Sequence, residues 1–190
     1  GADAIVMVEK TSVDGDTVSI ETQVEPGNHI RPAGDDVVEG DLVFPSGTEL
    51  SAGHLGLLCS LGLHEIETYP RLRVGVISTG DELVDDGGPL APGQIRDSNR
   101  RTLLSLLSGD GFEPVDLGLI ADDELAIETA LVQGAQNCDA VVTSGGVSMG
   151  DFDYVKAVLD RIGDMRWMQV AIKPAKPLAF GTIEGTPIFG

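Results

Sequence analysis

The stretch Thr143-Ser144-Gly145-Gly146-Val147-Ser148-Met149-Gly150-Asp151-Phe152-Asp153 joins a short apolar run to a helical pattern. The apolar run, Ala140-Val141-Val142, is typical of a buried strand, so glycines and hydroxyl residues lie where a strand passes into a helix. Backbone N–H groups freed by glycine can converge on phosphate oxygens there, and the positive end of the following helix favours the same charge. The stretch therefore predicts an anion-binding loop.

Two carboxylates stand inside this predicted anion site. Asp151 and Asp153 would repel a bound phosphate unless a cation lay between them. We therefore expect a divalent metal at the loop.

Strand and helix patterns alternate around the stretch. Strands are expected at residues 74–77, 112–117 and 138–143, and helices at 98–108, from an N-cap at Asp122, and after the quoted stretch. This order predicts an α/β fold with a doubly wound sheet and right-handed crossovers. Further strands are expected at residues 165–172, 178–183 and 186–189. The Glu184-Gly185 turn between the last two predicts an antiparallel pair near one edge, and so a mixed sheet.

The first residues of the chain have a different character. Residues 4–8 and 17–20 predict strands, with a hairpin turn at Asp14-Gly15-Asp16. A segment of about 35 residues cannot build a core of its own. Because the chain starts at Gly1 and ends within a strand pattern at Phe189-Gly190, we expect it to be a piece of a longer protein.

Residues 37–69 predict a small unit of strand and helix. The helix is expected to be capped by Ser51 and to end at Gly62. His54 and His64 have no carboxylate at ligand spacing, so we interpret them as structural histidines.

Composition excludes several classes of protein. The net charge is −19, with 31 acidic and 12 basic residues, which argues against a nucleic-acid-binding surface. No apolar run approaches the roughly 20 residues of a membrane span, and we expect a cytoplasmic protein without membrane contact. The acidic excess and scarce lysine suit a salt-rich cytoplasm, so we expect a halophilic source. Cys59 and Cys138 are expected to be buried free thiols.

Other polar motifs follow the predicted strands. Ser78-Thr79-Gly80-Asp81-Glu82 ends the first strand of the α/β domain, and ligands of open α/β sheets bind at carboxyl ends of strands. We expect this loop and the quoted stretch to face one crevice, although the first loop could simply reverse the chain. Asp97-Ser98-Asn99 enters the first crossover helix, where Asp97 or Ser98 could be only an N-cap. Asp122 could likewise be an N-cap or a metal ligand.

The segment Lys173-Pro174-Ala175-Lys176-Pro177 cannot be helical. Its two lysines would present ammonium groups to a phosphate or an oxyanion. Surface lysines beside an edge strand are the alternative.

Four motifs, in this order and spacing, closely resemble the molybdopterin molybdotransferase family, which includes MoeA and the gephyrin E domain. They are Ser78-Thr79-Gly80-Asp81-Glu82-Leu83, Ile95-Arg96-Asp97-Ser98-Asn99, Thr143 to Gly150, and Ile172 to Pro177. The first 70 residues, including the loop 28–36, also resemble that family.

The resemblance implies the last step of molybdenum cofactor synthesis. Family members take adenylylated molybdopterin and molybdate, release AMP with the help of Mg²⁺, and leave molybdenum on the dithiolene. Residues 71–190 would form the molybdopterin-binding domain, 37–70 part of a linking α+β domain and 1–36 part of a β-rich domain. A homodimer is expected, and a molybdopterin adenylyltransferase is a candidate partner.

The resemblance also suggests individual site residues. Glu82, Asp122 and Asp153 would bind the metal or take part in hydrolysis, and Asp36 would reach in from the partner subunit. The residues expected to bind the pterin substrate or molybdate are Ser78, Thr79, Gly80, Ser98, Asn99, Thr143, Ser144, Gly145, Gly146, Ser148, Gly150, Lys173 and Lys176.

Two functions other than molybdotransferase are compatible with parts of the sequence. A stand-alone molybdopterin adenylyltransferase shares the α/β domain, but residues 1–70 argue against it. A non-catalytic scaffold like the gephyrin E domain would need a peptide-binding surface.

Overall fold

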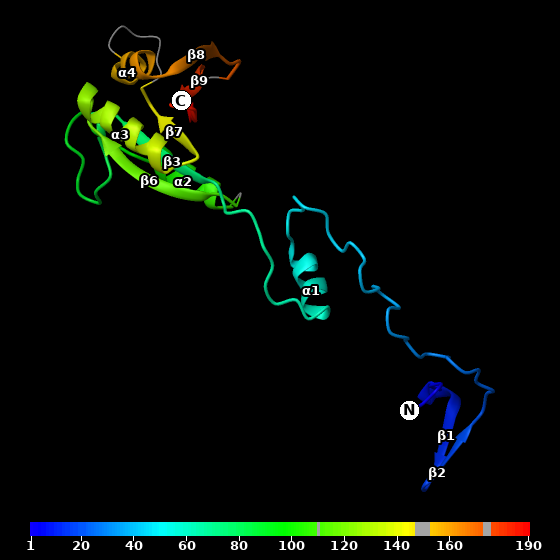
Figure 1. Cartoon of the computed structure of the whole chain (residues 1–190). Helices are drawn as coiled ribbons and strands as arrows, with labels where there is room; N and C mark the ends of the chain where they lie inside the picture. The colour runs from blue at the N-terminus through cyan, green and yellow to red at the C-terminus, as the bar shows by residue number, and fades with distance from the viewer. Residues whose placement is uncertain (110, 147–152, 173–175) are drawn as a thin grey trace. The chain divides into compact units, whose positions relative to one another are not determined.

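The computed structural model describes residues 1–109, 111–146, 153–172 and 176–190, and it divides the chain into two compact units. The first unit is Gly1–Ile66 and the second is Glu67–Gly190. The second unit contains the large sheet, and the first contains a hairpin and one helix (Figure 1). The finer division at residues 36 and 70 stays a prediction.

A β-hairpin opens the first unit. Strands β1 (Thr11–Asp14) and β2 (Thr17–Ile20) pair antiparallel, as the turn at residues 14–16 predicted. The strand expected at residues 4–8 is wrong, since only a short 3₁₀ helix, Val8–Lys10, begins there. Ile5 N donates to Asn28 O at 2.9 Å, but an isolated backbone hydrogen bond does not make a strand ladder.

Helix α1 (Ala52–Ser60) begins and ends as its sequence predicted. Ser51 N donates to Nδ1 of His54 at 3.0 Å, and the His54 ring packs edge-on against Phe44 at 4.7 Å, which confirms a structural histidine. Gly62, at φ 77°, donates to Cys59 O while Leu63 N donates to Leu58 O, which is a Schellman motif. Cys59 is exposed, contrary to expectation, whereas Cys138 is buried.

A six-stranded mixed sheet forms the second unit, in the order β6-β3-β7-β10-β9-β8. Its strands are β3 (Arg73–Thr79), β6 (Glu113–Ile120), β7 (Ala140–Ser144), β8 (Asp164–Gln169), β9 (Pro177–Ile183) and β10 (Thr186–Phe189). Strands β6, β3, β7 and β10 are parallel, and β9 and β8 continue antiparallel. The predicted mixed sheet is confirmed, because the antiparallel strands lie at one edge.

Three helices connect strands of this sheet, α2 (Asn99–Gly109) between β3 and β6, α3 (Glu124–Asn137) between β6 and β7, and α4 (Tyr154–Ile162) between β7 and β8. The connection from β3 to β6 and the connection from β6 to β7 cross the sheet in opposite directions, so right-handed crossovers put α2 and α3 on opposite faces. The doubly wound arrangement is therefore confirmed.

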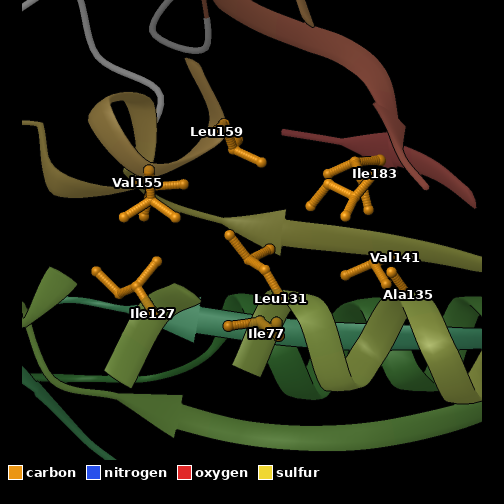
Figure 2. Close-up of a cluster of buried hydrophobic side chains, with 10 residues drawn as sticks. Ile77, Ile127, Leu131, Ala135, Val141, Val155, Leu159 and Ile183 are labelled. Atoms are coloured by element: carbon orange, nitrogen blue, oxygen red, sulfur yellow. The ribbon is translucent and has the colours of Figure 1, made fainter. Parts of the chain in front are cut away.

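The main core lies between the sheet and the helices α3 and α4. Figure 2 shows Ile127 of α3 and Val155 of α4 facing one another, with Leu131 of α3, Val141 of β7 and Ile183 of β9 in the same cluster. These side chains are at most 2% exposed. Their burial fixes α4 against the sheet.

One predicted helix start needs correction. Asp122 was expected to cap α3, but the cap is Asp123, whose Oδ1 accepts from Ala126 N at 2.8 Å. Two carboxylates stand side by side, and only Asp123 has the spacing that reaches a free N–H of the first turn. Within the described residues, no helix is long and apolar enough to cross a membrane.

Candidate functional site

The carboxyl ends of β3 and β7 lie side by side at the switch point of the sheet. Ser78 of β3 is in register with Ser144 of β7, and the connections that follow these strands leave in opposite directions. Open α/β sheets bind ligands in the crevice at such a point. The structure therefore brings the Ser78–Gly80 loop and the start of the Thr143–Gly146 loop together, as the sequence predicted.

Two consecutive glycines follow β7 at this end of the sheet. Gly145 has φ 94° and Gly146 has φ 66°, a conformation that L side chains rarely adopt. A Cβ on Gly145 would lie 3.0 Å from Thr79 O, and a Cβ on Gly146 would overlap Cγ2 of Val155. We call residues 78–80 and 143–146 the cradle. The missing Cβ atoms let its two loops pack against each other and against Val155.

Buried hydroxyl residues hold both walls of the cradle. Ser78 is 0% exposed and donates from Oγ to Oδ1 of Asp97 at 3.0 Å. Thr143 is 4% exposed and donates from Oγ1 to Gly145 O at 3.4 Å. Their hydroxyls therefore have partners within the protein, and direct binding by either residue stays a prediction.

Behind the cradle, Arg100 connects three carboxylates. Its Nε donates to Asp97 at 2.8 Å, while Nη1 and Nη2 pair with Asp116 and Asp85. Burial opposes the charge of Arg100, but hydrogen bonds with the three aspartates together raise its pKa above the ordinary value. Hydrogen bonds from Arg101 and Arg100 lower the pKa of Asp85.

The strands β4 (Leu83–Val84) and β5 (Ile95–Arg96) lie between β3 and α2 in the chain and bring Asp85 close to Arg100. They pair in parallel between the end of β3 and the start of α2. Ser98 and Asn99 follow at the start of α2 and are exposed near that end of β3. This position is compatible with their predicted binding role.

The acidic residues predicted to bind a metal are arranged as follows. Asp81 and Asp122 bridge the loops after β3 and β6, because each backbone N–H donates to the other's carboxylate, at 3.3 and 3.1 Å. Glu82 is exposed, and its carboxylate lies over Gly80. Asp153 caps α4 by accepting from Lys156 N at 3.0 Å. Among the described residues, no three His, Cys, Asp or Glu side chains are grouped closely enough to hold a metal ion.

Of the two predicted lysines, Lys176 lies at the same end of the sheet, where the parallel strands finish. Lys176 directly precedes β9, which runs antiparallel to β10 and therefore begins where β7 ends. Two strand spacings separate β9 from β7, about 10 Å. Lys176 is exposed, and its carbonyl accepts from Val170 N at 2.8 Å.

The remaining predicted residues are not brought to the cradle by the described structure. Asp36 is in the first unit, where it is exposed and pairs with Arg31. Ser148, Gly150 and Lys173 lie outside the described residues, as does Asp151.

Comparisons with known proteins match both units. Residues 75–190 match the family described as "probable molybdopterin binding domain", and residues 1–62 match "MoeA N-terminal region (domain I and II)". The chain belongs to the molybdopterin-binding domain family. The resemblance inferred from the four motifs is therefore confirmed.

Similar proteins and solved structures support the same family assignment. A protein of Haemophilus influenzae named molybdopterin molybdenumtransferase is 45% identical over 185 residues, 97% of this chain and 46% of that protein. Gephyrin of Dictyostelium discoideum is 37% identical over 96% of this chain and 27% of that protein. The crystal structure of the molybdopterin biosynthesis MoeA protein of Pyrococcus horikoshii matches with a TM-score of 0.76 and 31% identity, over 99% of this chain and 47% of that one. The chain spans about half the length of the curated relatives that it matches first.

Sequence reasoning missed the polar network of this molybdopterin-binding domain. Arg100 and its partners Asp85 and Asp116 were not singled out, and neither was the link between Asp81 and Asp122. One signal was available, since a cation in the first turn of a helix opposes the helix dipole. An arginine at that position suggests a nearby carboxylate, as Asp97 three residues earlier provides.

Proposed function

We propose that the chain is the molybdopterin-binding part of a molybdopterin molybdotransferase, which inserts molybdate into adenylylated molybdopterin and releases AMP. One observation carries the proposal: the glycine cradle lies between β3 and β7, in a chain that is 45% identical to a relative named for this activity. The cradle suits the pyrophosphate link of such a substrate. Gly145 and Gly146 let the chain after β7 pack closely against Thr79 and Val155, and α4, whose N-terminus would favour an anion, is the next helix along the chain.

The acidic side chains support Mg²⁺ as part of the proposal. Asp81, Asp122 and Glu82 stand at the ends of β3 and β6, and Asp153 stands at the start of α4. Mg²⁺ commonly uses one or two carboxylates together with substrate phosphates, so a cluster of three protein ligands is not needed. We propose Asp122, Glu82 and Asp153 as the carboxylates that hold it. Bound Mg²⁺ would neutralise the phosphate charge during release of AMP.

Lysine side chains would supply the remaining positive charge. Lys176 lies at the cradle edge of the sheet, and Lys173 belongs to the same segment of sequence. An ammonium group there can bind molybdate or a phosphate as a point charge.

A homodimer is the second part of the proposal, with Asp36 contributed by the partner subunit. The hairpin of the first unit supports a homodimer because it has an uncovered apolar face. Val13, Val18 and Ile20 share one face and are 67%, 59% and 58% exposed, while Ser12, Asp14, Thr17 and Ser19 share the other face. An apolar hairpin face is stable only when it is covered. Light scattering during size exclusion tests this, since a strictly monomeric protein would contradict it.

Binding and turnover together test the proposed function. The chain is titrated without oxygen with adenylylated molybdopterin, with and without Mg²⁺, and we expect saturable binding that Mg²⁺ strengthens. A hybrid in which the chain replaces the matching 185 residues of the Haemophilus influenzae relative is then assayed. We expect AMP release that requires molybdate, with the relative as the positive control.

Other outcomes would favour the alternatives. ATP-dependent adenylylation of free molybdopterin by the chain would identify an adenylyltransferase instead. If the folded chain binds no adenylylated molybdopterin, the proposal is rejected. The non-catalytic scaffold, the other alternative from the sequence, would then remain.

A further inference from the structure

We propose that Arg100 is a positioning residue for the cradle, acting through Asp97 and Ser78. The proposal rests on the proposed function, because the ligand that reports it is adenylylated molybdopterin. Arg100 and Asp97 lie behind the cradle wall and do not need to touch the ligand.

The first step is the geometry of Arg100. The residue is 2% exposed, and its guanidinium is shared among Asp97 at the entry to α2, Asp116 of β6 and Asp85 after β4. A planar guanidinium fixes the directions of its donors, which a lysine ammonium does not. Arg100 therefore holds three separate segments in one arrangement.

The second step is the double role of Asp97. Its side chain is 1% exposed, and its Oδ2 is bound by Nε of Arg100. Its Oδ1 accepts from Oγ of Ser78 at 3.0 Å and from the backbone N of Arg100 at 3.2 Å. A buried carboxylate without a cation is strongly unfavourable. The charge of Arg100 therefore allows Asp97 to remain buried beside Ser78.

The third step leads from Ser78 to the ligand site. Ser78 is 0% exposed and precedes Thr79 and Gly80, which form one wall of the cradle. Thr79 O lies 3.0 Å from the place of a Cβ on Gly145 in the other wall. A shift of Ser78 would therefore move Thr79 and change how the two loops of the cradle pack against each other.

A role in stability alone explains the network poorly. Replacing a buried ion cluster by apolar side chains is often neutral or stabilising, so burial of Arg100 is weak evidence that it serves stability. The network also ends at the cradle, whereas the hydrophobic core lies beneath α3 and α4. Positioning accounts for both facts.

Two variants of the whole chain test the proposal. Arg100→Lys keeps the charge but loses the fork, and Ser78→Ala removes only the bond to Asp97. The matched control is Arg73→Lys. Arg73 is the first residue of β3, so it lies at the end of the sheet opposite to the cradle, and it pairs there with Glu113. We measure the dissociation constant for adenylylated molybdopterin, the midpoint of thermal unfolding, and the ¹⁵N shifts of Gly80, Gly145 and Gly146.

We expect both variants to raise the dissociation constant about tenfold, which corresponds to about 1.4 kcal/mol of binding free energy. The shifts of the three glycines should move with it. Arg73→Lys should lower the unfolding midpoint but leave binding and these shifts unchanged. If Arg100→Lys does not fold, Ser78→Ala carries the test.

The two proposals fail in different ways. If the variants lose only thermal stability, with binding and glycine shifts as in the wild type, the network is structural and the positioning role is rejected. If the wild-type chain does not bind the ligand, the proposed function fails. The glycine shifts then decide positioning alone: movement supports it, and unchanged shifts overturn it.

Discussion

At the residue scale, Gly146 combines a positive φ of 66° with close packing against Val155 and Thr79. We predict that Gly146→Ala lowers the free energy of unfolding and weakens binding of adenylylated molybdopterin. The added Cβ must displace Val155 in the core, which costs about 1 to 3 kcal/mol in addition to the backbone strain. Chemical denaturation and ligand titration measure the two effects.

Gly185→Ala is the matched control for Gly146. Gly185 also has a positive φ, 88°, but no atom lies within 4 Å of the place of its Cβ. It should therefore show the backbone strain without the overlap or the loss of binding. Equal destabilisation by both substitutions, with binding intact, would contradict the role given to Gly146.

Asp153 offers a separation of structural and chemical roles. It caps α4 through Lys156 N, and asparagine caps a helix as well as aspartate does. We predict that Asp153→Asn keeps the unfolding midpoint but removes the strengthening of ligand binding by Mg²⁺. Asp153→Ala should lose this strengthening and also about 1 kcal/mol of stability.

The control for Asp153 is Asp123→Asn. Asp123 caps α3 in the same way, through Ala126 N at 2.8 Å, and has no assigned part in binding. It should change neither the midpoint nor the Mg²⁺ effect. Wild-type Mg²⁺ dependence in Asp153→Asn would remove Asp153 from the proposed metal site.

Local chemistry could be predicted for some residues and not for others. The αL glycines at 62 and 185 followed from neighbouring sequence, since the backbone conformation is set within a few residues. Asp123 rather than Asp122 as the cap depended on one position of helix register. Arg100 was missed because its partners Asp85 and Asp116 come from segments that only the sheet topology brings together.

At the scale of elements, the hairpin between β9 and β10 contains a residue that does not suit its turn. Glu184 has φ 49° and Gly185 has φ 88°, and a two-residue hairpin with both φ values positive favours Asn-Gly. We predict that Glu184→Asn raises the free energy of unfolding by about 0.5 to 1 kcal/mol, because asparagine tolerates this conformation.

Glu184→Gln is the control, since it removes the same charge and keeps the unfavourable conformation. Urea denaturation of the three proteins measures the difference. A gain equal in both variants would assign the effect to charge, and no gain in Glu184→Asn would contradict the prediction.

The predictable elements are those whose sequence pattern matches the burial that they reach. Strand β3 was predicted because its continuous apolar run is buried on both faces of the sheet. The strand expected at residues 4–8 failed because a strand needs a partner ladder, and residues 27–28 make only isolated backbone hydrogen bonds with residues 3 and 5. Pattern predicts an element only where the rest of the chain supplies its neighbour.

At the scale of the whole molecule, the sequence predicted that the loops after β3 and β7 face the same side, because ligands of open α/β sheets bind at the carboxyl ends of strands. The strand order that makes β3 and β7 neighbours at a switch point came from the structure. Thus the end of the sheet at which the cradle lies could be predicted without coordinates. The network behind it could not, because the order of elements does not specify which aspartate meets which arginine.

The net charge of −19 leads to the last prediction, which concerns salt. Exposed ion pairs such as Arg161 with Glu124 and Glu128 weaken in salt, but each contributes only about 0.2 to 1 kcal/mol. Repulsion among 31 acidic residues against 12 basic ones is the larger effect. Because the Debye length falls from about 10 Å at 0.1 M to about 3 Å at 1 M, screening should relieve it.

We therefore predict that the midpoint of thermal unfolding rises between about 0.1 and 1 M KCl and then levels off, as screening becomes complete. NaCl should act equally, since screening depends on ionic strength rather than on the cation. A midpoint that falls or stays constant would contradict both this balance of charges and the expectation of a salt-rich cytoplasm. A rise that continues in proportion to salt would instead indicate exclusion of salt from the protein surface, which needs no excess of acidic residues.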